Sequence, residues 1–137
     1  MKLIIQIPCY NEEETLASLL KTLPKKIMGF ETIEYLLIDD GSNDRSIEIA
    51  KSYNVHHIVS HLNNKGLAKT FMTGINECLK KNADVIVNID ADNQYDASCI
   101  VNLVNPILNT AISRYFIIFS LIFYLLNMGL LVCHVYR

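Results

Sequence analysis

The stretch of sequence that decides the fold runs Asp84-Val85-Ile86-Val87-Asn88-Ile89-Asp90-Ala91-Asp92-Asn93-Gln94. Its first half is a run of mostly β-branched apolar residues, which is typical of a strand covered on both faces. Two carboxylates one residue apart, Asp90 and Asp92, stand at the end of this predicted strand. Such a pair can direct its oxygens at one hard cation, and Mg²⁺ and Mn²⁺ prefer oxygen ligands. On this stretch alone, an acidic turn that faces water remains the alternative.

Length and composition set the outer bounds. The chain has 137 residues, which is enough for one small domain. Its net charge is −2 and it has no basic tract, so there is no electrostatic reason to expect nucleic acid as a partner. The hydrophobic fraction of 51% is high, and the excess lies towards the C-terminus.

Three further apolar runs precede the opening stretch, at residues 3–7, 33–38 and 55–59. Each is followed by a polar loop and then by apolar residues at helical spacing. Pro8 is expected to end the first strand because it cannot donate to a ladder, and Asn11 is expected to cap the first helix. Four strands alternating with helices predict an α/β fold with a mostly parallel sheet and helices on both faces.

In such sheets, ligands bind beyond the carboxyl ends of the strands. All four predicted strands end there in a polar loop: Tyr10-Asn11-Glu12, Asp39-Asp40, Asn64-Lys65-Gly66 and Asp90-Ala91-Asp92. Four such loops on one edge predict a binding site.

Two of these loops suggest particular roles. One acid of the pair Asp39 and Asp40 could cap the next helix while the other hydrogen-bonds a ligand, and the sequence leaves open which. Lys65 and Gly66 precede a predicted helix, where free backbone N–H groups would suit a phosphate. The chain has neither a dinucleotide Gly-X-Gly-X-X-Gly motif nor a Walker lysine loop, so phosphate handling is expected from a cation together with Lys65.

As a set, these motifs resemble the family 2 glycosyltransferases, and most of all the dolichyl- or undecaprenyl-phosphate sugar transferases. The resemblance covers about residues 1–108, with the motifs in the family's order and spacing. It is carried by Ile7-Pro8-Cys9-Tyr10-Asn11-Glu12-Glu13, Ile38-Asp39-Asp40-Gly41-Ser42-Asn43-Asp44, Asn64-Lys65-Gly66 and Asp90-Ala91-Asp92-Asn93-Gln94-Tyr95-Asp96.

The resemblance implies a fold of the GT-A, or Rossmann-like, type that binds a nucleotide-diphospho-sugar. It implies that an acid matching Asp39 or Asp40 hydrogen-bonds the base or ribose, and that Asp90 and Asp92 hold Mg²⁺ or Mn²⁺ against the donor diphosphate. Together with the residue-level reading of Lys65 and Gly66, the donor nucleotide-binding residues are expected to be Pro8, Tyr10, Asn11, Glu12, Asp39, Asp40, Lys65, Gly66, Asp90 and Gln94.

Towards its C-terminus the chain departs from the family pattern. The family's catalytic domain continues with a second half that carries acceptor contacts and candidate general bases. Here an incomplete donor-binding region (residues 1–108) and a linker (residues 109–114) lead into residues 115–133, which carry no charge. At ~1.5 Å per residue this run spans about 28 Å as a helix, close to a bilayer core. It is expected to be a transmembrane helix, with the N-terminal domain cytoplasmic; a buried helix is the alternative.

The expected reaction is sugar transfer from a nucleotide-diphospho-sugar to an acceptor such as a polyprenyl phosphate. One alternative is a truncated, catalytically inactive membrane protein that keeps only nucleotide binding. Another is a different metal-dependent phosphoryl-transfer domain that uses acidic strand ends. The motif from Pro8 to Glu12 argues against the second alternative.

Overall fold

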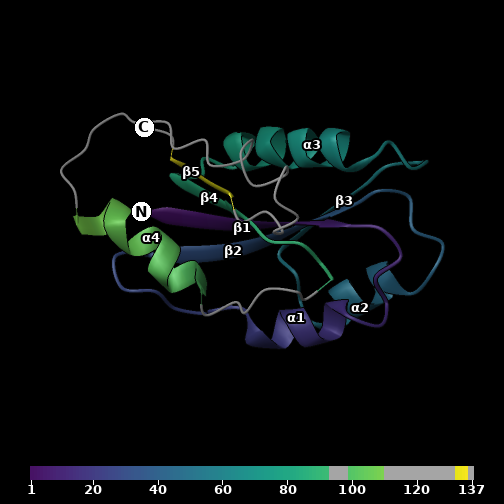
Figure 1. Ribbon diagram of the computed structural model, residues 1–137, viewed down its shortest axis with the longest axis horizontal. Coiled ribbons are helices and arrows are strands. Elements are labelled where there is room, and N and C mark those ends of the chain that lie inside the picture. Colours follow the sequence, from purple (N-terminus) through teal and green to yellow (C-terminus); the bar gives the residue numbers. More distant parts are fainter. Residues whose placement is uncertain (93–98, 110–131, 136–137) are drawn as a thin grey trace, which may run out of the picture.

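The computed structural model describes residues 1–92, 99–109 and 132–135. The strands in these ranges form one five-stranded sheet in the order β3-β2-β1-β4-β5 (Figure 1). The first four strands pair in parallel and β5 is antiparallel to β4. The predicted α/β alternation with a mostly parallel sheet is therefore confirmed. The strands are β1 (Lys2–Cys9), β2 (Thr32–Asp39), β3 (His57–Ser60), β4 (Val85–Asn88) and β5 (Val132–Val135). The helices are α1 (Leu16–Thr22), α2 (Ser46–Ser52), α3 (Leu67–Lys80) and α4 (Cys99–Asn109).

The described helices lie on both faces of the sheet, as predicted. Helix α3 lies on one face, and α1, α2 and α4 lie on the other (Figure 1). Because side chains alternate across a strand, even-numbered residues of β1, β2 and β4 point towards α3 and odd-numbered residues point away. The apolar cluster under α3 contains Ile4, Leu36, Ile38, Ile75, Cys78, Ala83 and Ile86. The opposite cluster includes Leu3, Ile5, Ile7, Leu37, Val85, Val87 and Ile89.

Pro8 does not end the first strand, contrary to prediction. Strand β1 continues through Pro8, which is paired in register with Ile38 of β2. In a parallel ladder the N–H and C=O of one residue point to the same neighbour, and Gln6 uses its C=O for Ile89 on the β4 side. Pro8 therefore also directs its N atom to that side, where the pairing with β4 has already ended at Gln6 and Asn88. The missing donor costs no ladder bond there.

The first helix begins later than predicted. Asn11 was expected to cap it, but α1 starts at Leu16 and the N–H groups of Thr15 and Leu16 donate to the C=O of Glu12. Asn11 instead adopts a positive φ of 54° and its side-chain oxygen accepts from the Asn43 N–H at 2.9 Å. The polar loop after β1 is thus longer than expected and contacts the loop after β2.

Most of the predicted C-terminal organisation lies outside the described residues. Asn109, the expected start of the linker, is the last residue of α4. Of the predicted helix over residues 115–133, only Val132 and Cys133 are described, and both lie in strand β5. Within the described part of the chain, none of the helices is both long and apolar enough to cross a bilayer.

Candidate functional site

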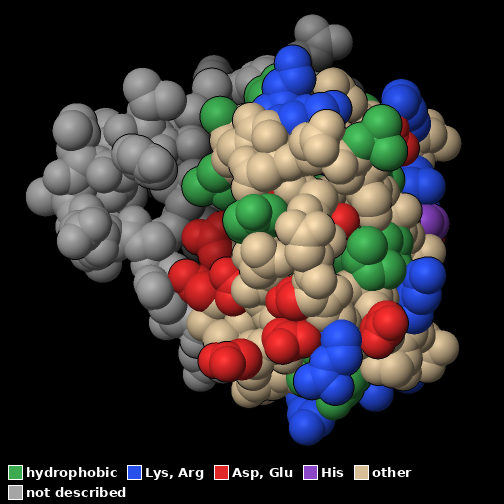
Figure 2. Space-filling view, turned by 90° about the vertical axis from the view of Figure 1, so that its right-hand side faces the viewer, with side chains coloured by type: hydrophobic (Ala, Val, Ile, Leu, Met, Phe, Trp, Pro, Cys, Tyr) green, Lys and Arg blue, Asp and Glu red, His purple; other side chains and the backbone are tan. Residues whose placement is uncertain are grey.

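A pocket of about 380 Å³ lies where β1, β2 and β4 end and α3 begins. This is the edge at which the sequence predicts a ligand site, and Figure 2 looks onto it and shows acidic side chains gathered there. The pocket is lined by Pro8, Cys9, Tyr10, Glu12, Asp40, Asn64, Gly66, Leu67, Thr70, Asp90, Ala91 and Asp92.

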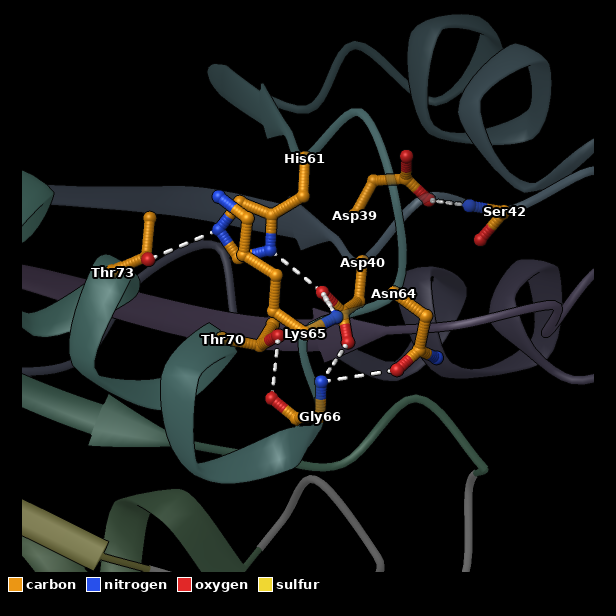
Figure 3. Close-up of polar contacts among 9 residues, drawn as sticks. All are labelled: Asp39, Asp40, Ser42, His61, Asn64, Lys65, Gly66, Thr70 and Thr73. Carbon is orange, nitrogen blue, oxygen red and sulfur yellow. Dashed lines mark hydrogen bonds and ion pairs between the residues drawn. The ribbon is translucent and has the colours of Figure 1, made fainter.

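Strand geometry separates the two neighbouring acids that the sequence could not distinguish. Asp40 follows Leu36 and Ile38 on the α3 face, which is the face that borders the pocket. Asp39 points to the opposite face and is 1% exposed. One of its carboxylate oxygens accepts from the Ser42 N–H at 3.1 Å, so Asp39 closes the turn after β2 (Figure 3).

Asp40 organises the polar loop that precedes α3. Its carboxylate accepts from the N–H groups of Lys65 at 2.9 Å and Gly66 at 2.8 Å, and it lies 2.6 Å from Nδ1 of His61 (Figure 3). Burial by itself raises the pKa of Asp40, but the hydrogen bonds from His61, Lys65 and Gly66 outweigh burial and hold this pKa below its ordinary value. Asp40 is therefore a charged anchor of the loop at neutral pH.

His61 is a site residue that the sequence did not reveal. Its side chain is buried, and its second ring nitrogen lies 3.0 Å from the Thr73 hydroxyl on α3. The β2–β3 register pairs Asp39 with Ser60, so the next residue of each chain segment, Asp40 and His61, come side by side. Only this register brings the two residues together, and the register of two strands cannot be read from a single sequence.

The N–H groups of Lys65 and Gly66 themselves are not free for a phosphate. Both donate to Asp40, and the Gly66 N–H also lies 3.0 Å from the Asn64 side-chain oxygen. Gly66 still borders the pocket, with a positive φ of 85° that favours glycine. Lys65 is exposed and is not among the residues that line the pocket.

The loop after β1 is tied to the start of α2. The Asn11 N–H donates to the Ser42 hydroxyl and the Glu12 N–H to the Ser46 hydroxyl, each at 2.9 Å. The Glu13 N–H donates to the Asp44 carboxylate, also at 2.9 Å. These three bonds fix the backbone that presents Tyr10 and Glu12 to the pocket, whereas Asn11 itself points into the loop contact.

Cys9 lines the pocket, but its thiol is unreactive at neutral pH. Burial raises the pKa of its thiol to about 12. The thiolate is the nucleophile and the metal ligand, so a thiol that stays protonated at neutral pH serves as neither. Cys9 contributes apolar surface to the pocket floor.

Asp90 and Asp92 both border the pocket, with the buried Ala91 between them. Two carboxylates at a strand end fit a hard divalent cation that takes its remaining ligands from water or phosphate. In the described residues no group of three or more His, Cys, Asp or Glu side chains is arranged to hold a metal, so a protein-only cage is absent from that part of the chain. Gln94, which was expected among the donor nucleotide-binding residues, lies outside the described residues.

The sequence model of glycosyl transferase family 2 matches residues 4–119. The chain belongs to glycosyl transferase family 2. Family 2 relatives include an undecaprenyl-phosphate 4-deoxy-4-formamido-L-arabinose transferase of Photorhabdus laumondii, which is 39% identical over 68% of this chain and 30% of its own length. Another is a dolichol-phosphate mannosyltransferase of Pyrococcus furiosus, 31% identical over 80% of this chain and 31% of its own length.

Solved structures share the fold of this family 2 chain. Glucosyl-3-phosphoglycerate synthase from Mycobacterium tuberculosis, in complex with Mn²⁺, uridine diphosphate and glucosyl-3-phosphoglycerate, superposes with a TM-score of 0.65 at 21% identity. The match covers 80% of this chain and 40% of the synthase. At that identity the likeness shows the fold alone. The chain spans less than half the length of each of these three proteins.

Proposed function

We propose that this chain binds a nucleotide-diphospho-sugar in the pocket at the carboxyl edge of its sheet, for transfer of the sugar to an acceptor. The proposed donor-binding region is residues 1–108. The observation that carries the proposal is the convergence of Tyr10, Glu12 and Asp40 with Asp90 and Asp92 around one pocket. Membership of glycosyl transferase family 2 gives that pocket its chemical context.

The side chains around the pocket suggest a division of roles. Tyr10 is 43% exposed, and its aromatic ring would offer a surface for a nucleoside base. Asp40 holds the loop through Gly66 against the pocket, as its hydrogen bonds indicate. Asp90 and Asp92 would hold Mg²⁺ or Mn²⁺ beside the diphosphate. When bound, such a cation neutralises charge on the departing nucleoside diphosphate and so lowers the barrier to transfer.

For the acceptor we propose a polyprenyl phosphate. Relatives named for transfer to undecaprenyl phosphate and for dolichol-phosphate mannose support this choice. The charge-free run that begins at residue 115 supports association with a membrane, where such an acceptor resides. We propose that the donor-binding region faces the cytoplasm.

Calorimetric titration of the detergent-solubilised full chain with UDP and with GDP tests donor binding. Each nucleotide is titrated once with Mn²⁺ and once with EDTA. We expect saturable binding of one nucleotide that needs the metal. Absence of binding to both nucleotides, in a sample whose circular dichroism shows it to be folded, would overturn the proposal. Release of phosphate from simple phosphoesters would instead favour a metal-dependent phosphoryl-transfer domain.

Asp92→Ala tests the metal assignment directly. Asp92 lies in the turn beyond β4 and belongs to neither apolar cluster, so its removal leaves the apolar core intact and the fold is expected to persist. We expect metal-dependent UDP or GDP binding to disappear in calorimetry. Glu48→Ala, which removes an exposed acid from α2 and changes the net charge equally, is the matched control and should bind as the wild type does. Unchanged affinity of Asp92→Ala in Mn²⁺ would exclude Asp92 as a ligand.

A further inference from the structure

Three polar side chains form a line beneath the pocket, on the α3 face of the sheet. Nε2 of Gln6 on β1 donates to Oδ1 of Asn88 on β4 at 3.0 Å. Nδ2 of Asn88 donates in turn to Oδ1 of Asp90 at 3.4 Å. Gln6 is 0% exposed and Asn88 is 2% exposed, so this line runs from the pocket into the interior. We refer to Gln6 and Asn88 as the amide relay.

The direction of the relay follows from the carboxylate at its end. An ionised carboxylate only accepts hydrogen bonds, so Asn88 must turn its NH₂ group towards Asp90. Oδ1 of Asn88 then faces Gln6, which must present its own NH₂ group. Oε1 of Gln6 is left over, and among the described residues it is the buried side-chain oxygen or nitrogen that has no hydrogen-bond partner.

The protein tolerates two unfavourable features to hold the relay. A buried oxygen without a partner is destabilising, and so is a glycine inside a helix. Gly74 of α3 lies against Gln6: a Cβ at this position would overlap Oε1 of Gln6 and would lie 2.8 Å from Cδ1 of Ile38. A pair of apolar side chains at the Gln6 and Asn88 positions would avoid the first feature. The two amides are explained if they orient Asp90, which lines the pocket.

We propose that Asn88 and Gln6 are positioning residues for Asp90, an inference that rests on the proposed role of Asp90 as a metal ligand. Asn88 binds one carboxylate oxygen from the buried side. It thereby restrains rotation of the carboxylate. Gln6 fixes the orientation of the Asn88 amide. Partners behind a metal ligand orient that ligand and tune the affinity of the site.

Two variants interrupt the relay at different distances from the pocket. Asn88→Ala removes the direct partner of Asp90, and Gln6→Met removes only the second amide while keeping the length of the side chain. The readout is the Mn²⁺ dissociation constant of the full chain at saturating UDP, or at saturating GDP if that is the nucleotide which binds, measured by electron paramagnetic resonance of free Mn²⁺. The thermal midpoint in EDTA reports stability separately.

We expect Asn88→Ala to weaken Mn²⁺ binding by about 10- to 100-fold, the usual range for a partner behind a metal ligand. Gln6→Met should weaken it less and change the thermal midpoint little, because it removes the unpaired Oε1 of Gln6 but leaves Oδ1 of Asn88 without its donor. The double variant should bind Mn²⁺ no more weakly than Asn88→Ala, since groups that act in series are not additive. Ile4→Met, two residues earlier on the same strand and face, is the matched control and should keep the wild-type Mn²⁺ affinity.

The outcomes separate the two proposals. Wild-type Mn²⁺ binding that is unchanged in Gln6→Met and in a folded Asn88→Ala would overturn the relay and leave the donor site standing. Additive losses in the double variant would also overturn it, because two independent sites would then be acting. Absence of Mn²⁺ binding in the wild type would overturn the donor site itself, and the relay with it. Should Asn88→Ala fail to fold, the Mn²⁺ dissociation constants of Gln6→Met and Ile4→Met still test the relay. Equal constants in these two variants would overturn it.

Discussion

At the scale of single residues, Asp40 shows how one carboxylate can shape a site although protein groups already occupy its oxygens. Both of its oxygens accept backbone N–H groups from the loop before α3, and His61 contacts one of them. With 5% of its side chain exposed, it is held almost out of water. The N–H groups of the loop that Asp40 orders therefore stabilise its negative charge.

Asp40→Asn should lower the free energy of unfolding by about 1–3 kcal/mol at neutral pH, because buried N–H groups lose a charged acceptor. The pKa of Asp40 lies below its ordinary value of 3.8, so its stabilising contribution is complete above that pH and is lost as the pH falls further. The stability difference between wild type and variant should therefore shrink below about pH 3.8. Urea unfolding at several pH values measures it.

Glu48→Gln, at an exposed acid on α2, is the control for this pH series and should change stability little at any pH. A wild-type advantage over Asp40→Asn that stays constant down to strongly acidic pH would contradict a lowered pKa for Asp40.

The sequence predicted that one of Asp39 and Asp40 could cap the next helix while the other hydrogen-bonds a ligand, but it did not show which acid takes which role. The decision depends on where the strand meets the sheet, because a shift of one residue exchanges the two faces. His61 was missed for a related reason: its partner is 21 residues away and is brought near by the pairing of β2 with β3.

At the scale of elements, the loop after β1 and the start of α2 act as one unit. Three backbone N–H groups of the loop, from Asn11 to Glu13, donate to side chains at or just before α2. The loop therefore has few backbone groups left to satisfy and presents Tyr10 and Glu12 in a fixed arrangement. Residues of α2 do not themselves line the pocket, but its first residue, Ser46, holds the loop that does.

Ser46→Ala should lower the free energy of unfolding by about 1 kcal/mol and weaken binding of the donor nucleotide, since the Glu12 N–H loses its acceptor. Ser46 is 0% exposed, so water does not replace the hydroxyl. Chemical unfolding and calorimetry measure the two effects.

Ser52→Ala removes a hydroxyl from the exposed end of the same helix, where it donates to the Ile49 C=O. It should leave nucleotide affinity at the wild-type value. Equal losses of affinity in Ser46→Ala and Ser52→Ala would show that α2 stability, and not the loop contact, governs binding.

The four parallel strands and their helices were predictable because apolar period and polar loops recur in a regular order. Two boundaries were not. Pro8 stays within β1 because its missing donor points past the end of β4, which depends on the partner strand. Helix α1 starts after Asn11 because that residue bonds to Asn43 of another loop. Both outcomes are set by tertiary neighbours.

At the scale of the whole molecule, the place of β5 constrains the C-terminal part of the chain. Residues 132–135 pair with β4 inside the sheet. A single membrane crossing over residues 115–133 would carry residues 132–135 to the opposite side of the bilayer from β4. The β4–β5 pairing and that single crossing are mutually exclusive, whereas membrane association by the apolar run before residue 132 does not conflict with the pairing.

The register of β5 can be tested by crosslinking, because Val87 is paired with the native Cys133. Directly opposed residues in antiparallel strands have Cα atoms about 4.5–5.5 Å apart, within the reach of a disulfide. Val87→Cys should therefore form an intramolecular disulfide with Cys133 under mild oxidation, and peptide mapping by mass spectrometry would identify it.

Ile86→Cys is the matched control, since its side chain points to the opposite face of β4 and should not reach Cys133. No crosslink in Val87→Cys under conditions that keep the protein folded would contradict β5 and reopen the single crossing.

Strand β5 also covers one edge of β4. Without it, β4 would present a row of unpaired N–H and C=O groups along Val85-Ile86-Val87, an apolar segment with high β-propensity. Such an open edge is a template for strands of neighbouring molecules. Proteolysis or premature termination before residue 132 would thus do more than shorten the chain, because it would expose the edge of β4 as a seed for aggregation.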